Sequence, residues 1–366
     1  MPTPDNPPRI TVRDIASKLA ISHTTVSRSL RNDRRISEPT RLKVQQLAAQ
    51  MGYRPDPMLA ALAHYRRQST PSPIGAELAW INNWPDSKKL RSYKEFELYW
   101  QGAKTEAERS GYRLEEFIIN RDLTPTRLNK ILLARNIQGI LLPPHGGLPL
   151  DWEAIQWKNF SVVRFGYTIT QYPFHIVTSS QVADGLIAFQ NMWRLGYRRI
   201  GLVTSPDMLT RFGAGFLFGQ WRQTANITIP PLPLAVGEAE SKRLALLESW
   251  IKKFKPDALM TDQTQIPDLL QRIGCKVPED IGLATFSILD GSTDAGIDQQ
   301  SQEIGRAAAQ MLISLINHNE RGIPEVCREL LIDGRWVDGR TLPPRDEASQ
   351  PMVKANSSTK ANPSNQ

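Results

Sequence analysis

The chain has 366 residues, of which 40% are hydrophobic and 8% aromatic, values typical of soluble globular proteins with two or three folding units. Its start, MPTPDNPPRI, lacks the apolar segment of a signal peptide, and no run approaches the roughly 18 apolar residues that span a bilayer. Two cysteines, Cys275 and Cys327, stand at no metal-ligand spacing. We therefore expect a cytoplasmic protein that binds no metal and no cofactor.

The formal net charge of +8 is concentrated at the amino end. Residues 1–67 contain twelve Lys/Arg and five Asp/Glu, a net charge of +7. The remaining 299 residues are nearly balanced, with 33 basic and 32 acidic side chains. A charge confined to one end indicates a local polyanion-binding module. The alternative, a flexible basic tail, is weakened by the helical periodicity of the same segment.

Two short helices are predicted at the amino end. Thr11 can cap the first with Asp14 three residues later, and this helix ends by about Ala20. Ser22 is a suitable cap for the second helix. The side chains expected to face a shared core are Ile15, Ala16, Leu19, Val26 and Leu30.

A third helix follows, with Ser37 as its predicted cap and Gly52 as its stop. A short hinge helix is expected from Asp56 to about His64. From Gly75 onward, apolar strands alternate with helical segments, which predicts two α/β lobes of parallel sheets flanked by helices. The predicted divisions are a disordered 1–8, a helix-turn-helix domain 9–54, a hinge and linker 55–74, a two-lobed domain 75–342 and a disordered tail 343–366.

The two amino-end helices are typical of a helix-turn-helix, whose second helix lies in the DNA major groove. His23 and Thr24 stand at the tip of that helix, where they can reach base edges, and Arg28 can contact guanine with two hydrogen bonds. Hydroxyl groups that can contact phosphate belong to Thr11, Ser22, Thr25 and Ser27. The alternative is that these polar residues form an ordinary solvated surface.

The segment ITVRDIASKLAISHTTVSRSLRNDRRISEPTRLKVQQLAAQMGYRPDP resembles the headpiece of the LacI/GalR family of bacterial repressors. It matches the T-x-x-D-[IV]-A, [IV]-S-x-x-T-V-S-R and G-Y-x-P elements in order and spacing. The resemblance implies that His23, Thr24 and Arg28 read bases, with Arg34 and Tyr53 as further DNA contacts. It also implies that Leu62 of the hinge helix inserts into the minor groove. A linker helix that packs on the core is the alternative for this leucine.

The long α/β region resembles the ligand-binding core of the same family, a two-lobed fold similar to periplasmic sugar-binding proteins. The matching segments are MWRLGYRRIGLVTSP, FKPDALMTD, AGIDQQSQEIGRAAAQML and IDGRWVDGRTL. The resemblance implies that the chain crosses between lobes near Thr178, Asp298 and Leu331. It further implies that an effector in the interlobe cleft changes lobe closure and thereby DNA affinity.

The residues expected to bind an effector differ from the family pattern. Sugar-binding members commonly have an arginine where this chain has Phe212, with Arg211 one step away. The usual acidic pair after the IGLATF strand is replaced by Ser287 and Ile288. The candidate cleft residues, chosen at strand ends, are Asn82, Trp84, His145, Arg164, Arg211, Asp262 and Ser287. Trp84 could stack on a sugar, and either arginine could bind a carboxylate or phosphate, whereas a loop or core role is the alternative for each.

Three other functions are compared with that of an effector-controlled DNA-binding regulator. An enzyme with an appended DNA-binding module would need a nucleophile, paired carboxylates or a metal cluster, none of which the sequence pattern contains. A periplasmic binding protein would need a signal peptide and no basic headpiece. A regulator whose core serves only dimerisation stays open. We therefore predict a homodimeric, sequence-specific transcription repressor, not an enzyme, that binds a near-palindromic operator and a small-molecule effector such as a sugar.

Overall fold

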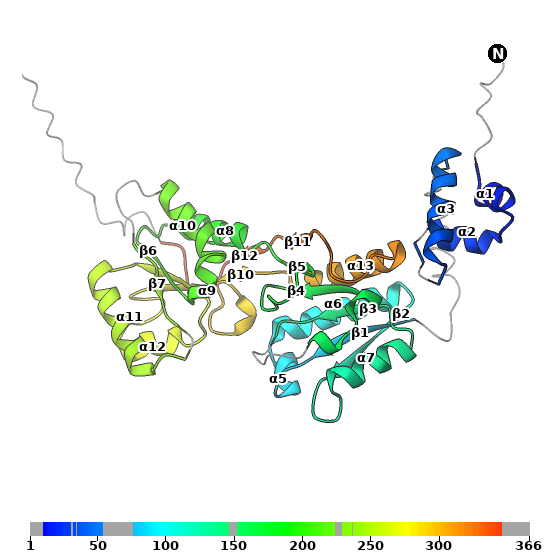
Figure 1. Cartoon of the computed structure of the whole chain (residues 1–366). Helices are drawn as coiled ribbons and strands as arrows, with labels where there is room; N and C mark the ends of the chain where they lie inside the picture. Colours follow the sequence, from blue (N-terminus) through cyan, green and yellow to red (C-terminus); the bar gives the residue numbers. More distant parts are fainter. Residues whose placement is uncertain are drawn as a thin grey trace, which may run out of the picture. The chain divides into compact units, whose positions relative to one another are not determined.

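A computed structural model of the chain describes residues 10–30, 32–33, 35–53, 76–145, 152–223, 229–235 and 237–345. These residues form a helical amino-terminal region and two α/β lobes, each built on a six-stranded sheet (Figure 1). The predicted fold class is therefore confirmed. The predicted hinge helix with Leu62, the disordered residues 1–8, Arg34 and the tail from residue 346 lie outside the described residues.

The amino-terminal region contains α1 (Val12–Leu19), α2 (His23–Leu30) and α3 (Glu38–Gln50). Their apolar side chains meet in one small core in which Ile15, Val26 and Val44 are fully buried. The predicted Thr11 cap is confirmed, since its hydroxyl accepts the Asp14 N–H and the Asp14 carboxylate accepts the Thr11 N–H at 2.7 Å.

The caps of the next two helices differ. The Ser22 hydroxyl accepts the Thr25 N–H at 3.0 Å, as predicted for the start of α2. Ser37 is the N-cap residue of α3, as predicted, but its hydroxyl lies 2.8 Å from the Thr40 hydroxyl and makes no capping bond to a helix N–H. Pro39 in the first turn of α3 has no N–H to satisfy, which lowers the need for such a bond.

The first lobe contains a fully parallel sheet with the strand order β11-β5-β4-β3-β1-β2. Its strands are β1 (Ala76–Asn82), β2 (Tyr112–Ile118), β3 (Gly139–Leu142), β4 (Ser161–Phe165), β5 (His175–Ser179) and β11 (Glu329–Ile332). Its helices are α5 (Ser87–Ser92), α6 (Lys94–Arg109), α7 (Pro125–Ala134) and α13 (Ser301–His318), with the 3₁₀ turns η1 (Trp152–Ala154) and η2 (Trp157–Asn159).

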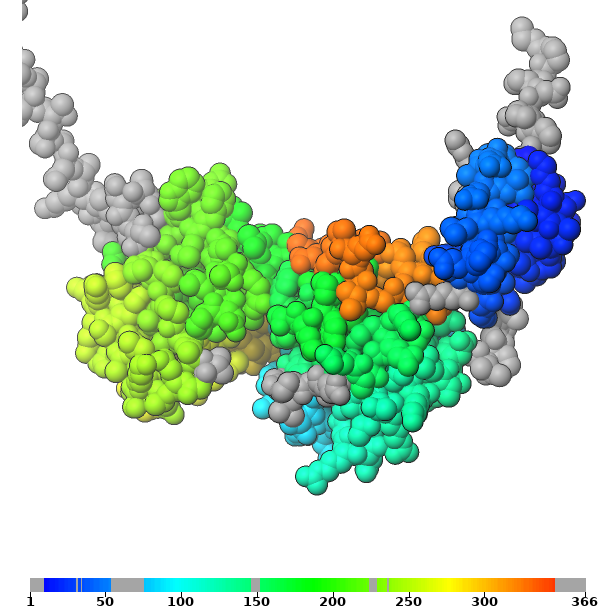
Figure 2. All heavy atoms as spheres, viewed as in Figure 1, coloured from blue at the N-terminus to red at the C-terminus, as the bar shows by residue number. Residues whose placement is uncertain are grey.

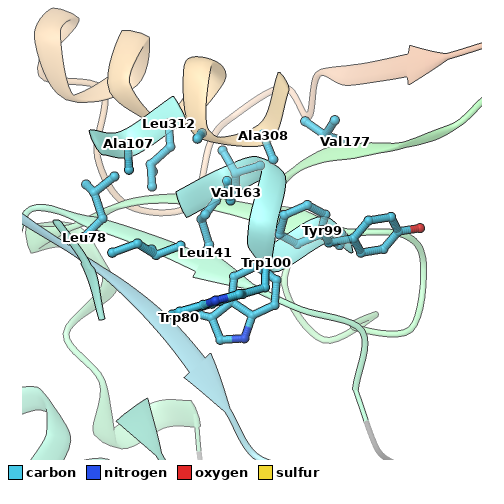
Figure 3. Packing of buried hydrophobic residues seen from close by; sticks show 14 of the residues in the cluster. Leu78, Trp80, Tyr99, Trp100, Ala107, Leu141, Val163, Val177, Ala308 and Leu312 are labelled. Carbon is cyan, nitrogen blue, oxygen red and sulfur yellow. The ribbon is translucent and has the colours of Figure 1, made fainter. Parts of the chain in front are cut away.

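Strand side chains alternate between two hydrophobic layers in this lobe. Leu78 and Trp80 pack under α6 and α13 (Figure 3), while Ala79 and Ile81 face α7 on the other side of the sheet. Burial on both faces explains why these strands read as continuous apolar runs. α13 comes late in the sequence, and Figure 2 shows this segment in orange against green residues of the earlier part of the lobe.

The second lobe has the strand order β12-β10-β9-β8-β6-β7, in which only the β10–β12 pair is antiparallel. Its strands are β6 (Ile200–Thr204), β7 (Leu232–Pro233), β8 (Ala258–Thr261), β9 (Gly282–Thr285), β10 (Gly296–Asp298) and β12 (Arg335–Val337). Its helices are α8 (Gln181–Arg194), α9 (Pro206–Leu209), α10 (Phe212–Gln223), α11 (Glu240–Phe254) and α12 (Ile266–Arg272), with the 3₁₀ turn η3 (Ile288–Asp290).

Helices α8 and α10 approach each other closely because glycines stand at their contact. A Cβ atom on Gly185 would overlap the Phe212 carbonyl, and one on Gly215 would overlap the Val182 carbonyl. These two helices cover one face of the second sheet, and α11 and α12 cover the other.

The chain passes from one lobe to the other after residues 179, 299 and 332, each one residue beyond the predicted crossing. Residues 343–345, which were predicted to belong to the disordered tail, pack on the second lobe. The Tyr197 hydroxyl donates to the Pro343 carbonyl at 2.8 Å, and the Arg345 N–H donates to the Leu195 carbonyl. Within the described ranges, no helix is both long enough and apolar enough to cross a bilayer.

Candidate DNA-binding and effector-binding sites

The turn between α1 and α2 is formed by Ala20, Ile21 and Ser22. Ala20 adopts a left-handed conformation with φ of 52°, and the Ile21 N–H donates to the Ala16 carbonyl at 3.1 Å. This closes α1 and lets the chain restart as α2 after three residues. The result is a helix-turn-helix with α3 packed behind it.

The first turn of α2 presents His23 and Thr24 as exposed side chains, and Arg28 follows half-buried one turn later. These three are the residues that the sequence predicts to read bases. They differ from Ile15 and Val26, whose side chains are buried in the core. The exposed tip of α2 can therefore enter a groove without disturbing the packing of the three helices.

The hydroxyl residues predicted to contact phosphate have structural partners. The Thr11 hydroxyl lies 2.7 Å from Asp14 Oδ2, and the Ser22 and Thr25 hydroxyls lie 2.8 Å apart. Ser27 is half-buried, and Tyr53 packs against the apolar core of the three helices. Thr11 and Ser22 thus cap the starts of α1 and α2, with Thr25 in the first turn of α2, so backbone N–H groups lie at the same exposed ends.

Acidic side chains compensate some of the basic charge in this region. Arg35 pairs with Asp33 at 2.6 Å, and its hydrogen bonds hold the pKa of Asp33 down at about 2. Arg41 donates to the Ile36 carbonyl at 2.8 Å. Arg35 and Arg41 therefore brace the loop before α3, whereas Arg28 lies on α2, the predicted groove-binding helix.

In the first lobe, the candidate residues lie at the carboxyl ends of neighbouring strands β1, β3 and β4. Asn82 is fully buried, and its amide donates to the Glu116 carboxylate at 2.8 Å and to the Ser87 carbonyl at 2.9 Å. The Asn82 side-chain oxygen accepts the Trp84 N–H. Asn82 therefore shapes the loop after β1 and offers little to a ligand.

Trp84 and His145 lie close together in the same lobe. The Trp84 indole N–H donates to the Pro144 carbonyl at 2.8 Å, which fixes the ring beside the loop after β3. The Asn83 amide nitrogen lies 2.6 Å from His145 Nε2, so this ring nitrogen is the acceptor. Burial lowers the pKa of His145, which favours the neutral imidazole. Asn83 was not among the predicted residues, although its position directly after β1 is the signal that could have found it.

Arg164 has a structural role. Its guanidinium donates to the carbonyls of Phe174 (3.2 Å), Gly166 (3.2 Å) and Ile169 (2.6 Å). These bonds hold the loop between β4 and β5 in place. The prediction that Arg164 could meet an anionic ligand loses its physical basis, because the guanidinium is buried and directed at backbone oxygens.

In the second lobe, Asp262 and Ser205 join the carboxyl ends of β8 and β6. The Ser205 hydroxyl donates to Asp262 Oδ2 at 2.6 Å, and the Ser205 N–H donates to Oδ1 at 3.0 Å. Ser205 was not predicted, although it directly follows an apolar strand as Asp262 does. Ser287 follows β9, and Arg211 reaches the Met208 sulfur at 3.0 Å.

The position expected to carry a sugar-binding arginine is occupied by a buried ring. Phe212 begins α10 and is 3% exposed, and Phe286, directly after β9, is 1% exposed. Their side chains belong to the hydrophobic layer under α8 and α10. The fold therefore uses this position for packing.

The comparisons with known proteins agree with both parts of the chain. Residues 11–56 match the family described as bacterial regulatory proteins, lacI family, and residues 189–341 match the periplasmic binding protein-like domain. A helix-turn-helix followed by such a core defines a DNA-binding transcription regulator. The chain belongs to the lacI family of bacterial regulatory proteins, whose members are regulators and not enzymes.

Individual relatives are similar over most of the chain. The HTH-type transcriptional repressor CytR of Escherichia coli K12 is 25% identical over 345 residues, covering 88% of this chain and 95% of CytR. Among solved structures, the transcriptional regulator CelR in complex with cellobiose has a TM-score of 0.54 at 16% identity, covering 91% of this chain and all of that one. The lac repressor dimer bound to operator and an anti-inducer has a TM-score of 0.50 at 18% identity, covering 92% and 99%.

Proposed function

We propose that this regulator represses transcription by binding a near-palindromic operator as a homodimer. The observation that carries the proposal is the exposed tip of α2, with His23 and Thr24, on a compact three-helix region within the basic residues 1–67. Two such tips related by a two-fold axis would read two half-sites. The lac repressor, similar in fold, is described as a dimer bound to operator, which supports this arrangement.

A small-molecule effector is the second part of the proposal. CelR, also similar in fold, is described in complex with cellobiose. We infer that residues at the carboxyl ends of the strands hold a sugar or related metabolite, with the Trp84 ring as a stacking surface in the first lobe. Among the predicted effector residues, Trp84, His145, Arg211, Asp262 and Ser287 stay candidates, whereas Asn82 and Arg164 donate their hydrogen bonds to groups within the first lobe.

Two observations favour an effector-independent regulator whose core serves only dimerisation. The buried Phe212 and the engaged Arg164 leave two expected ligand-binding positions committed to structure. This alternative predicts that no metabolite stabilises the full chain or changes its DNA affinity.

Selection of bound sequences from random DNA by the full-length protein tests operator binding. We expect a two-fold symmetric consensus, and a variant lacking residues 1–67 should select no sequence while it remains a folded dimer. Selection of a consensus by that variant, or an asymmetric consensus from the full chain, would contradict the proposal.

A thermal-shift screen of the full chain with sugars, sugar acids and nucleosides tests effector binding. A ligand that binds only the folded state raises the transition temperature by mass action. A compound that raises it in the parent and not in the Trp84→Ala variant supports the effector site. A screen without any shift favours the alternative.

A further inference from the structure

Asp184 is a buried carboxylate that no step of DNA or effector binding uses. It lies in the first turn of α8 and is 0% exposed. Its Oδ1 atom accepts the Gly334 N–H at 2.8 Å, and its Oδ2 atom has no hydrogen-bond partner among the described residues. Burying a carboxylate oxygen without a hydrogen-bond donor costs free energy.

Gly334, the hydrogen-bond partner of Asp184, lies just after a crossing between the lobes. The last crossing between lobes follows residue 332, so Gly334 is the second residue of the returning segment. A Cβ atom at Gly334 would lie only 2.6 Å from Asp184 Oδ1 and 2.8 Å from the Ile297 side chain. The backbone of Gly334 is therefore in direct contact with the Asp184 carboxylate. Since α8 begins just after the first crossing, Asp184 ties the first and last crossing segments together within the second lobe.

The burial of Asp184 and the charges around it favour its protonated form. Burial is the main cause that raises the pKa of Asp184 to about 7; the nearby Asp333 raises it further, and the Gly334 N–H lowers it. Charged groups on the elements packed against α8 do not neutralise it. Arg335 on β12 pairs with Asp298 on β10 at 2.8 Å, and Arg222 is the only charged residue of α10, near its carboxyl end. β6 has no charged residue, and α8 itself adds only Arg194 at its far end.

We propose that Asp184 is a proton-linked positioning residue that holds the returning segment at Gly334 when it is protonated and releases it when it is ionised. The neutral carboxyl group keeps its carbonyl oxygen as an acceptor for the Gly334 N–H. The ionised group regains hydration only when the segment opens and exposes the carboxylate, so ionisation shifts the local equilibrium toward the open form.

The sign of the pH dependence follows from linkage. A carboxyl group that titrates higher in the closed form than in the open form binds more protons when closed. The closed form is therefore most stable below the ordinary Asp pKa, loses stability as pH rises through the interval toward 7, and changes little above it. The segment at Gly334 should be firmly held in acid and loosened near neutral pH.

Amide hydrogen exchange of the full chain tests this directly. After correction for intrinsic exchange, the protection of residues 333–336 in the parent should fall by at least about tenfold between pH 5 and pH 7. In the Asp184→Asn variant, which cannot ionise, protection should not depend on pH. Asp207→Asn, which removes an exposed carboxylate from the same lobe, serves as the matched control and should behave as the parent does.

Pronounced dependence on pH that survives in Asp184→Asn, or protection in the parent that is the same at both pH values, would overturn the proposal. If the variant does not fold, the carboxyl carbon resonance of Asp184 in the parent decides, because a titration midpoint near 4 is incompatible with it. A further consequence, pH-dependent release of operator by an effector, rests on the proposed function. Failure of DNA binding would remove this consequence and leave the exchange result unaffected.

Discussion

Phe212 stacks on Phe286 with ring centroids 4.7 Å apart and an interplanar angle of 25°. Phe212 begins α10 and Phe286 directly follows β9, so the rings bridge a helix and the sheet it covers. Such a contact contributes about 0.5–1.5 kcal/mol beyond the burial of area. Position 212, where sugar-binding family members commonly have an arginine, therefore serves packing in this regulator and is unavailable for a charged ligand contact.

Phe212→Ala should destabilise the second lobe by about 3–5 kcal/mol, because it removes a buried ring and leaves a cavity. Phe218→Ala is the matched control on the same helix, and its 48% exposed ring should cost less than about 0.5 kcal/mol. Chemical unfolding of both variants in the full chain measures the difference. Equal losses in the two variants would contradict the packing role of Phe212.

Arg28→Ala should weaken operator binding by about 1–3 kcal/mol and relax preference at one base position. Affinities for a set of operators with single base changes check this. Lys43→Ala on the exposed face of α3 is the control and should keep the base preference of the parent. An unchanged preference in Arg28→Ala would refute its assigned role.

Thr11→Ala should lower the stability of α1 by about 1 kcal/mol, because it removes one half of the capping box with Asp14. Thr24→Ala should leave that stability unchanged and weaken DNA binding, because Thr24 is exposed at the tip of α2. Amide exchange of residues 12–19 and operator affinity, measured for both variants, separate the two roles. The assignment fails if Thr24→Ala loosens α1 as much as Thr11→Ala does.

Glu115→Gln should reduce the loss of stability of the first lobe in acid. Hydrogen bonds from Arg135 and then from Arg113 lower the pKa of Glu115 to about 2, so ionised Glu115 stabilises the folded lobe above the ordinary Glu pKa. This contribution disappears as pH falls from about 4 toward 2. Unfolding of the full chain between pH 5 and pH 2 measures it. Glu108→Gln, in an exposed pair with Lys104 on α6, should follow the parent at every pH.

Several features were determined by the sequence alone. Local rules predicted the Thr11 capping box, the Ser22 cap and the core residues of the three amino-terminal helices, because each depends on neighbours within four residues. Apolar runs separated by helical segments predicted the parallel sheets, because strands buried on both faces carry no polar alternation. The resemblance then predicted the crossings to within one residue.

Other features depended on tertiary structure. The sequence placed Asn82 and Arg164 at strand ends, but only the folded lobe brings the Glu116 carboxylate and three loop carbonyls within reach of them. The bond between Asp184 and Gly334 joins residues 150 positions apart, so no local pattern could reveal it. The sequence by itself determined the three amino-terminal helices and the alternation of strands with helices in the two lobes, since these follow from short-range periodicity and capping. The tertiary structure alone decided which polar side chains form hydrogen bonds within the fold, because such bonds require donors and acceptors from distant parts of the chain.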